Sequence, residues 1–154
     1  MSRTVFAAGL LLLASPVAFS QATLTETVTP SFGSGMGGPA NRRFVLDTND
    51  QVTGPNAADY LNGAVSGEII VQRKGGPTLV YILAENITTS GGVNANAIIC
   101  KWHNTPEVDC SGIGILRIVV GRRRLTLGID MTTTQFHTGG DTASISFDIT
   151  ATFL

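Results

Sequence analysis

Residues that could do metal or nucleophilic chemistry gather in one short stretch of this chain. Cys100, His103 and Cys110 lie close together, and His137 follows later. Thiolates and imidazoles bind zinc, and a cysteine beside a histidine can act as a nucleophile. The Cys-x2-His-x6-Cys spacing matches no strong zinc pattern, however, and two isolated cysteines in an oxidising compartment most simply form a disulfide. We therefore predict a Cys100–Cys110 disulfide, with no metal, no cofactor and no reactive thiol.

Oxygen-bearing side chains are the second candidate for chemistry. The run Asp47-Thr-Asn-Asp50 offers calcium ligands. Its spacing does not match an EF-hand loop, and such residues are typical of turns, so a turn is the favoured interpretation. The carboxylates of Asp59, Glu68 and Glu85 are scattered and suggest no glycosidase pair. The sequence therefore predicts a protein that is not an enzyme.

Three consecutive arginines, Arg122 to Arg124, form the one local cationic cluster. Such a cluster can contact lipopolysaccharide, an anionic glycan or an acidic partner. The favoured interpretation is structural. Arg123 would share a strand face with Leu125 and Leu127, while its two neighbours point outward and protect an exposed sheet edge.

The elements that must position these side chains are predicted to be strands. Charged residues make up 14% of the chain and glycine occurs 18 times. Low charge with many turn-forming and β-branched residues favours an all-β domain. Apolar segments separated by turn signals predict an immunoglobulin-like β-sandwich of about seven or eight strands. The segments expected to be extended are 22–29, 42–48, 65–73, 78–86, 95–102, 113–120, 122–129 and 143–154.

Two of these regions carry specific expectations. Residues 79–83 are apolar throughout, which predicts a central strand buried on both faces. Residues 113–129 contain Gly121 and predict either one long strand bent at the glycine or two strands. A turn through Thr105 and Pro106 is expected to bring Cys110 back toward Cys100.

The C-terminal segment has the clearest pattern in the chain. Its odd positions from Ala143 to Phe153 are apolar, and its even positions before Leu154 are Ser, Asp or Thr. This period of two predicts a strand with one face on a core and the other in water. The side chains expected to meet the core or a partner strand are Ile145, Phe147, Ile149 and Phe153.

The N-terminal residues have the features of a secretory signal peptide. Arg3 precedes an apolar run, and small residues allow cleavage after Ser20 or Ala22. No later segment is long and apolar enough to span a membrane. We expect a protein secreted to the periplasm, the outer cell surface or the extracellular medium.

The rest of the chain divides at a Gly/Pro/Ser-rich connector. The predicted organisation is a signal peptide over 1–22, an N-terminal strand and connector over 23–41, and a β-sandwich domain over 42–154. The chain has ten basic residues, and nine remain without Arg3, against eleven acidic ones. This balance gives no general electrostatic case for binding nucleic acid.

The C-terminal half resembles a family of secreted bacterial proteins. The similarity is to the family called "domain of unknown function 4402", whose members look like relatives of fimbrial and spore-coat-type subunits. It implies a β-sandwich and no catalytic residues. The motifs that carry it are Ala97-Ile-Ile-Cys-Lys-Trp-His-Asn104, Cys110-Ser-Gly112, Leu116-Arg-Ile-Val-Val-Gly121, Leu125-Thr-Leu-Gly128, and Gly139-Gly140 before the alternating residues 144–153.

Two functional hypotheses follow. The first is an exported bacterial structural or interaction protein, resembling a pilus-type subunit or adhesin-like domain, which pairs with another copy or an assembly partner by strand addition. Glu26 interrupts the apolar face that an N-terminal donor strand would use. The competing expectation is therefore a self-complete sandwich, in which both terminal strands pair within the same chain. The second hypothesis is an exported module that binds glycan, lipid or metal through the 47–59 and 100–110 loops.

Overall fold

The computed structural model describes residues 22–138 and 141–154. The predicted signal peptide, apart from Ala22, and the Gly139-Gly140 pair lie outside the described residues. Within the described ranges, no helix has the length and apolar character needed to cross a membrane.

The described chain is all-β, as the sequence predicts. Seven strands have five or more residues, and five have two to four. The total of twelve strands exceeds the expected seven or eight, because short strands carry little sequence signal. One 3-10 turn, η1 (Ala57–Asp59), interrupts them. The strands are β1 (Ala22–Val28), β2 (Ser34–Met36), β3 (Arg43–Leu46), β4 (Val52–Thr53), β5 (Tyr60–Asn62), β6 (Gly67–Arg73), β7 (Thr78–Ser90), β8 (Val93–Trp102), β9 (Val108–Asp109), β10 (Ile115–Val119), β11 (Arg122–Thr133) and β12 (Ser144–Phe153).

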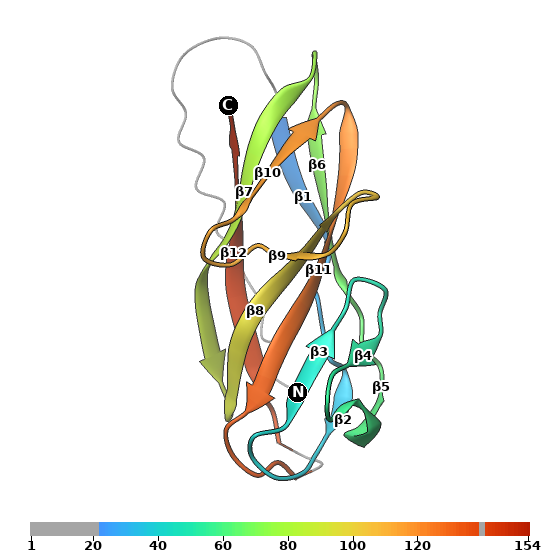
Figure 1. Cartoon of the computed structure of the whole chain (residues 1–154), viewed down its shortest axis with the longest axis vertical. Helices are drawn as coiled ribbons and strands as arrows, with labels where there is room; N and C mark the ends of the chain where they lie inside the picture. The colour runs from blue at the N-terminus through green and yellow to red at the C-terminus, as the bar shows by residue number, and fades with distance from the viewer. Residues whose placement is uncertain (1–21, 139–140) are drawn as a thin grey trace, which may run out of the picture.

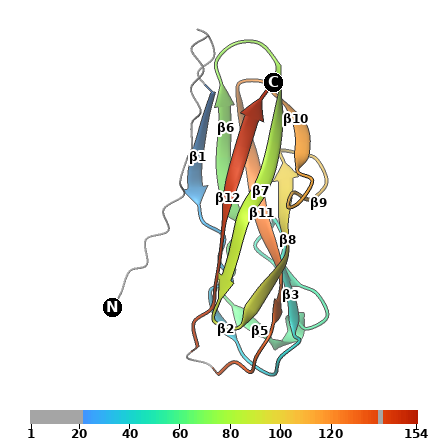
Figure 2. The same ribbon diagram turned by 90° about the vertical axis from the view of Figure 1, so that its left-hand side faces the viewer.

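Two antiparallel sheets face each other in a sandwich-like arrangement (Figures 1 and 2). The larger, seven-stranded sheet has the order β1-β6-β11-β3-β4, with β8 pairing β11 and β9. The smaller sheet has the order β10-β7-β12, and β2 pairs with β5 in a separate ribbon. Each sheet buries one face against the other, as antiparallel sheets commonly do.

The core fills the space between the two sheets. Strand β11 supplies Leu125, Leu127, Ile129 and Met131 at alternate positions, and all four side chains are buried. This strand pairs with β6 and then β3 on one side and with β8 on the other. It is therefore the central element of the larger sheet. The other large, fully buried side chains include Phe44, Leu46, Val71, Val80, Ile82, Ile98 and Val119.

One charged residue is buried on β11 and is compensated by its neighbours. Asp130 accepts hydrogen bonds from Arg43 Nε at 3.0 Å and from Asn96 Nδ2 at 2.9 Å. Burial raises the pKa of Asp130, but the hydrogen bonds from Arg43 and Asn96 and the charge of Arg43 outweigh it, so the pKa is lowered overall. The carboxylate is thus held in its charged form while it links β3, β8 and β11.

The structure decides the two open points about individual strands. Strand β7 is central in the smaller sheet, but burial on both faces is wrong, because Leu79 on its outer face is 42% exposed. No second layer covers that face among the described residues. Residues 113–129 form two strands, and β10 and β11 lie in different sheets. Gly121 has a φ of 63°, which lets the chain turn between them.

Candidate functional site

The C-terminal strand β12 presents its two faces as the sequence predicts. Ile145, Phe147, Ile149 and Phe153 pack against the core, together with Ala143 and Ala151. On the opposite face, polar side chains bridge to β7: Ser146 Oγ lies 2.6 Å from Thr88 Oγ1, and Asp148 accepts a hydrogen bond of 2.8 Å from Asn86. The apolar side chains of β12 are nevertheless only partly buried, unlike those of β11.

The reason for this partial burial is the position of β12. Among the described strands it pairs with β7 alone, so it forms an outer edge of the smaller sheet. An edge strand lacks a neighbour to cover one flank of each inward-pointing side chain, and it leaves a row of backbone groups unpaired.

A bulge on β7 preserves the alternation along β12. The pairing register shifts between Ser146 and Asp148, where Asn86 and Ile87 of β7 both lie opposite Phe147. Asn86 takes a φ of 52°, a left-handed conformation that asparagine tolerates better than most residues. The extra β7 residue keeps Ile145 and Ile149 on the same face, on either side of the bulge.

The hydrogen-bond pattern shows which backbone groups of β12 point to its open flank. The Leu154 N–H donates to the Leu79 carbonyl of β7 at 3.0 Å. In an antiparallel pair, bonding to the neighbour alternates from one residue to the next. With this register, the backbone N–H and C=O groups of Thr150 and Thr152 point toward β7. Those of Ala151 and Phe153 point away from it.

The N-terminal strand β1 is the corresponding edge of the larger sheet. It pairs with β6, and Leu24 packs against the core, whereas Val28 is 37% exposed. Glu26 is exposed and accepts a hydrogen bond of 2.7 Å from Thr29 Oγ1. In Figure 2 the smaller sheet runs from β12 through β7 to β10, and the larger one runs from β1 through β6 in the same direction. Both terminal strands therefore pair within this one chain, as the competing expectation of a self-complete sandwich has it. They border the same flank of the sandwich.

The Cys100–Cys110 disulfide is confirmed. The two Cα atoms are 5.7 Å apart and both side chains are fully buried. The Cys110 N–H donates to Ile98 in the larger sheet, and the Cys110 carbonyl accepts from Ala84 in the smaller one, each at 2.9 Å. The disulfide therefore fixes the segment by which the chain crosses between the sheets.

Other residues with possible metal chemistry have structural roles instead. His137 is buried, with Nε2 3.0 Å from the Gly92 carbonyl oxygen. Asp47 accepts hydrogen bonds from the backbone N–H groups of Asn49 and Gln51, as in a turn. Hydrogen bonds from the Ser66 hydroxyl and N–H lower the pKa of Asp50. Within the described ranges, no three His, Cys, Asp or Glu residues are placed to hold a metal ion.

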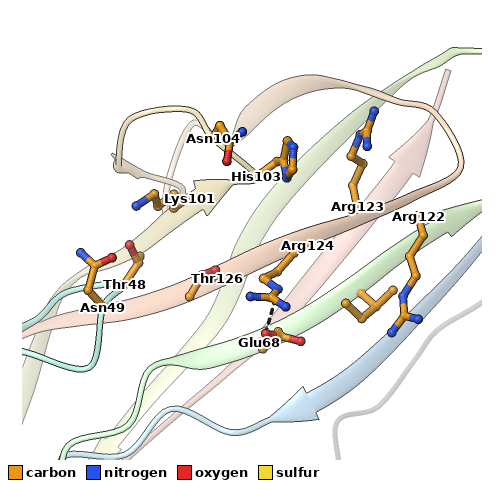
Figure 3. A pocket seen from close by; sticks show the side chains of 11 residues that line it. Thr48, Asn49, Glu68, Lys101, His103, Asn104, Arg122, Arg123, Arg124 and Thr126 are labelled. Carbon is orange, nitrogen blue, oxygen red and sulfur yellow. Dashed lines mark ion pairs between the residues drawn. The ribbon is translucent and has the colours of Figure 1, made fainter.

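The two loops singled out from the sequence meet at one open concavity of about 640 Å³ (Figure 3). Its floor is the outer face of β6, β8 and β11. The 47–59 loop contributes Thr48 and Asn49, and the loop after Cys100 contributes His103 and Asn104. The strands contribute Glu68, Ile70, Lys101, Arg122, Arg124 and Thr126, and Arg123 also borders the concavity.

The three arginines are the first three residues of β11. Arg123 is opposite the buried Val71 of β6, on the face of Leu125, as predicted. Arg122 and Arg124 occupy the other face, and Figure 3 shows them extending toward β6 while Arg123 extends the opposite way. Pairing of β11 with β8 begins at Leu125, so the arginine segment has β6 as its one strand partner among the described residues. The interpretation that the cluster protects an exposed stretch of sheet edge therefore stays a prediction, although β11 is central from Leu125 onward.

Sequence reasoning missed one cation of this concavity. Lys101 lies between Cys100 and Trp102, whose side chains are both buried. That alternation shows that Lys101 points outward. Its pairing opposite Thr126 of β11, which brings it to the same face as Arg124, is visible only in the structure.

Comparison with family models, with curated proteins and with solved structures finds no match for this chain. The resemblance to secreted fimbrial-type proteins therefore stays a prediction.

Proposed function

We propose that this chain is an exported, non-catalytic structural or interaction protein of the bacterial envelope or surface, which accepts a partner strand along the open flank of β12. The single observation that carries the proposal is the partly buried apolar row of β12 beside a backbone edge that no other described strand pairs with. A strand added there would take up the outward N–H and C=O groups and cover Ile145, Ile149 and Phe153 from the side.

The energetic case rests on apolar surface that the chain does not bury by itself. Complete burial of one large aliphatic or aromatic side chain contributes about 1.5–3 kcal/mol. The four large apolar residues of β12 are already partly buried, so each gains a fraction of that amount. Main-chain hydrogen bonds along the edge then add affinity, and the alternation of side chains adds specificity.

The source of the added strand is a second copy or a dedicated assembly partner. Strand β1 is held only at the edge of the larger sheet, and Leu24 is its one large side chain packed on the core. Glu26 makes it a poor donor, because a charged side chain would replace an apolar one in the row. Direct pairing of two β12 edges avoids that charge.

Export and an immunoglobulin-like arrangement of the sandwich belong to the same proposal. The disulfide supports export, because such bonds persist in oxidising compartments. Two facing antiparallel sheets support the immunoglobulin-like arrangement. The disulfide closes a local loop near β8 and β9, unlike the inter-sheet bridge of antibody domains.

The test is the molar mass in solution of residues 22–154, measured by light scattering from low micromolar to near-millimolar concentration. The wild-type chain is expected to form dimers or longer assemblies as concentration rises. Ala151→Pro removes an N–H that faces the open flank and should keep the chain monomeric. A wild-type chain that stays monomeric throughout this range would refute assembly between copies through β12.

A second variant identifies the donor. Deletion of residues 22–30 removes β1 and leaves β12 intact. Assembly that survives the deletion assigns pairing to the two β12 edges, whereas assembly that disappears while the fold is retained assigns the donor role to β1.

A further inference from the structure

The concavity over β6, β8 and β11 carries more positive charge than the molecule as a whole. The chain has a formal net charge of -1, yet Lys101, Arg122, Arg123 and Arg124 all border this one depression. Arg124 Nε is paired with Glu68 Oε2 at 3.0 Å. Within the described ranges, the other three cations form no ion pair within 4.0 Å.

The two nearby carboxylates are already engaged. Glu68 also accepts a hydrogen bond of 3.1 Å from Thr27 Oγ1, in addition to its pair with Arg124. Glu107 accepts from the backbone N–H of Thr48 at 3.0 Å and from its hydroxyl. These acids hold the walls of the concavity in place, and the cations opposite them are left to attract an anionic ligand.

The rest of the lining is polar and suits hydroxyl groups. Asn49, Asn104 and Thr126 offer amide and hydroxyl groups that both donate and accept hydrogen bonds. The one aliphatic residue of the lining, Ile70, is only 7% exposed. An acyl chain would therefore find little apolar surface here.

We infer that this concavity binds an acidic oligosaccharide, with carboxylate or sulfate groups held by Lys101 and Arg122 and sugar hydroxyls held by the polar wall. Its volume of about 640 Å³ lies within the range of about 300–1,000 Å³ that small-molecule sites occupy. Arginine forms two parallel hydrogen bonds to a planar carboxylate, which gives orientation as well as affinity.

Single-stranded nucleic acid is the competing polyanion, and the lining argues against it. Proteins that bind it stack bases on exposed aromatic side chains. Trp102, which follows Lys101, is 5% exposed and its side chain belongs to the core cluster. Among the described residues, the lining holds no Phe, Tyr or Trp, and the imidazole of His103 is its one ring. A sugar acid needs cations and hydrogen-bonding groups, which this lining provides.

The inference is tested by titrating residues 22–154 with pentagalacturonic acid in a calorimeter, with maltopentaose as the neutral sugar of the same length. The wild-type chain should bind the acidic sugar and not the neutral one. Binding should weaken as sodium chloride is added, because exposed charges are screened over about 10 Å at 0.1 M salt.

Variants locate the site. Lys101→Gln and Arg122→Gln should each weaken binding about tenfold, the scale of one lost charge-assisted hydrogen bond. Lys74→Gln removes the same charge from the exposed turn after β6, outside the lining, and should leave affinity unchanged. Each variant is first shown to melt at the wild-type temperature.

Three results would overturn the inference. They are a wild-type chain that does not bind pentagalacturonic acid, equal affinity in all three variants, and tighter binding of a single-stranded oligonucleotide than of the acidic sugar. None of these results depends on assembly through β12, because the concavity lies on the other sheet.

Discussion

Two neighbouring proline substitutions on β12 should have opposite consequences for stability. The register turns the N–H of Thr152 toward the Tyr81 carbonyl of β7, and turns the N–H of Ala151 toward the open flank. Proline lacks an N–H and is tolerated in edge strands only where that group faces solvent. Thr152→Pro therefore breaks the β7–β12 ladder, and Ala151→Pro leaves it intact.

The expected magnitudes follow from this difference. Thr152→Pro loses a hydrogen bond with a net value of about 0.5–1.5 kcal/mol and leaves the Tyr81 carbonyl unpaired at a further cost of about 1–3 kcal/mol. We expect a total loss of about 1.5–4.5 kcal/mol. The unfolding entropy of the 133 residues from Ala22 onward (154 less 21) is about 0.28 kcal/mol/K, so Tm should fall by about 5–16 °C.

Ala151→Pro should change the free energy of unfolding by no more than about 1 kcal/mol. Its stiffer unfolded chain contributes about 0.4–1 kcal/mol in favour of folding, which offsets the strain of fitting the ring. The two variants are matched, because in each one the residue before proline is already extended, as proline requires. Thermal unfolding followed by circular dichroism measures both, at a low micromolar concentration where we expect the chain to be monomeric.

The comparison also has a clear failing outcome. If Ala151→Pro unfolds at a lower temperature than Thr152→Pro, the assignment of the outward backbone groups is wrong. The β12 flank would then not be the open edge on which strand addition depends.

Three further predictions concern the disulfide, the buried carboxylate and the close approach of two strands. Replacing both Cys100 and Cys110 by Ala opens a loop of about eleven residues and should lower the free energy of unfolding by roughly 3 kcal/mol in urea titrations; a loss below about 1 kcal/mol would contradict a role in stability. Because the pKa of Asp130 is lowered in the folded chain, its stabilising contribution is present above its unfolded pKa of about 3.9 and is lost as pH falls through the folded value. Asp130→Asn should therefore flatten the acid limb of the Tm–pH curve, and an unchanged limb would exclude this group. A Cβ at Gly128 would collide with a backbone carbonyl of β3, so Gly128→Ala should cost roughly 1–3 kcal/mol, whereas Gly76→Ala, with nothing within 4 Å, should be neutral.

The sequence predicted the all-β class and the faces of several strands, because both depend on local patterns. Alternation placed Phe147 and Ile149 on the core side and Arg123 on the face of Leu125, and the structure agrees. The disulfide was also predictable, because only two cysteines are present and a turn separates them. These features require no knowledge of which strands are neighbours.

Neighbour relations were the part that could not be derived. Residues 79–83 are apolar enough for burial on both faces, but no element among the described residues covers the outer side of β7, where Leu79 stays exposed. The three arginines predicted an exposed edge because charged residues protect edges, and the structure places them at the start of β11, where β6 is the one paired strand among the described residues. That the rest of β11 is the central strand of the larger sheet could not be predicted. In both cases a side chain indicates its own polarity, but the strands that cover it are distant in sequence.

The same distinction explains what is unusual about β12. Alternation of Ile145, Phe147, Ile149 and Phe153 would look the same in a central strand and in an edge strand. The difference appears only in their partial burial, which arises because β7 is the one strand beside them among the described residues. These side chains already stabilise the monomer through the part of their surface that packs on the core. Under our proposal, a partner strand on the open flank of β12 would cover the part that is still exposed. The molar mass of the Ala151→Pro variant, compared with that of the wild-type chain, tests that proposal directly.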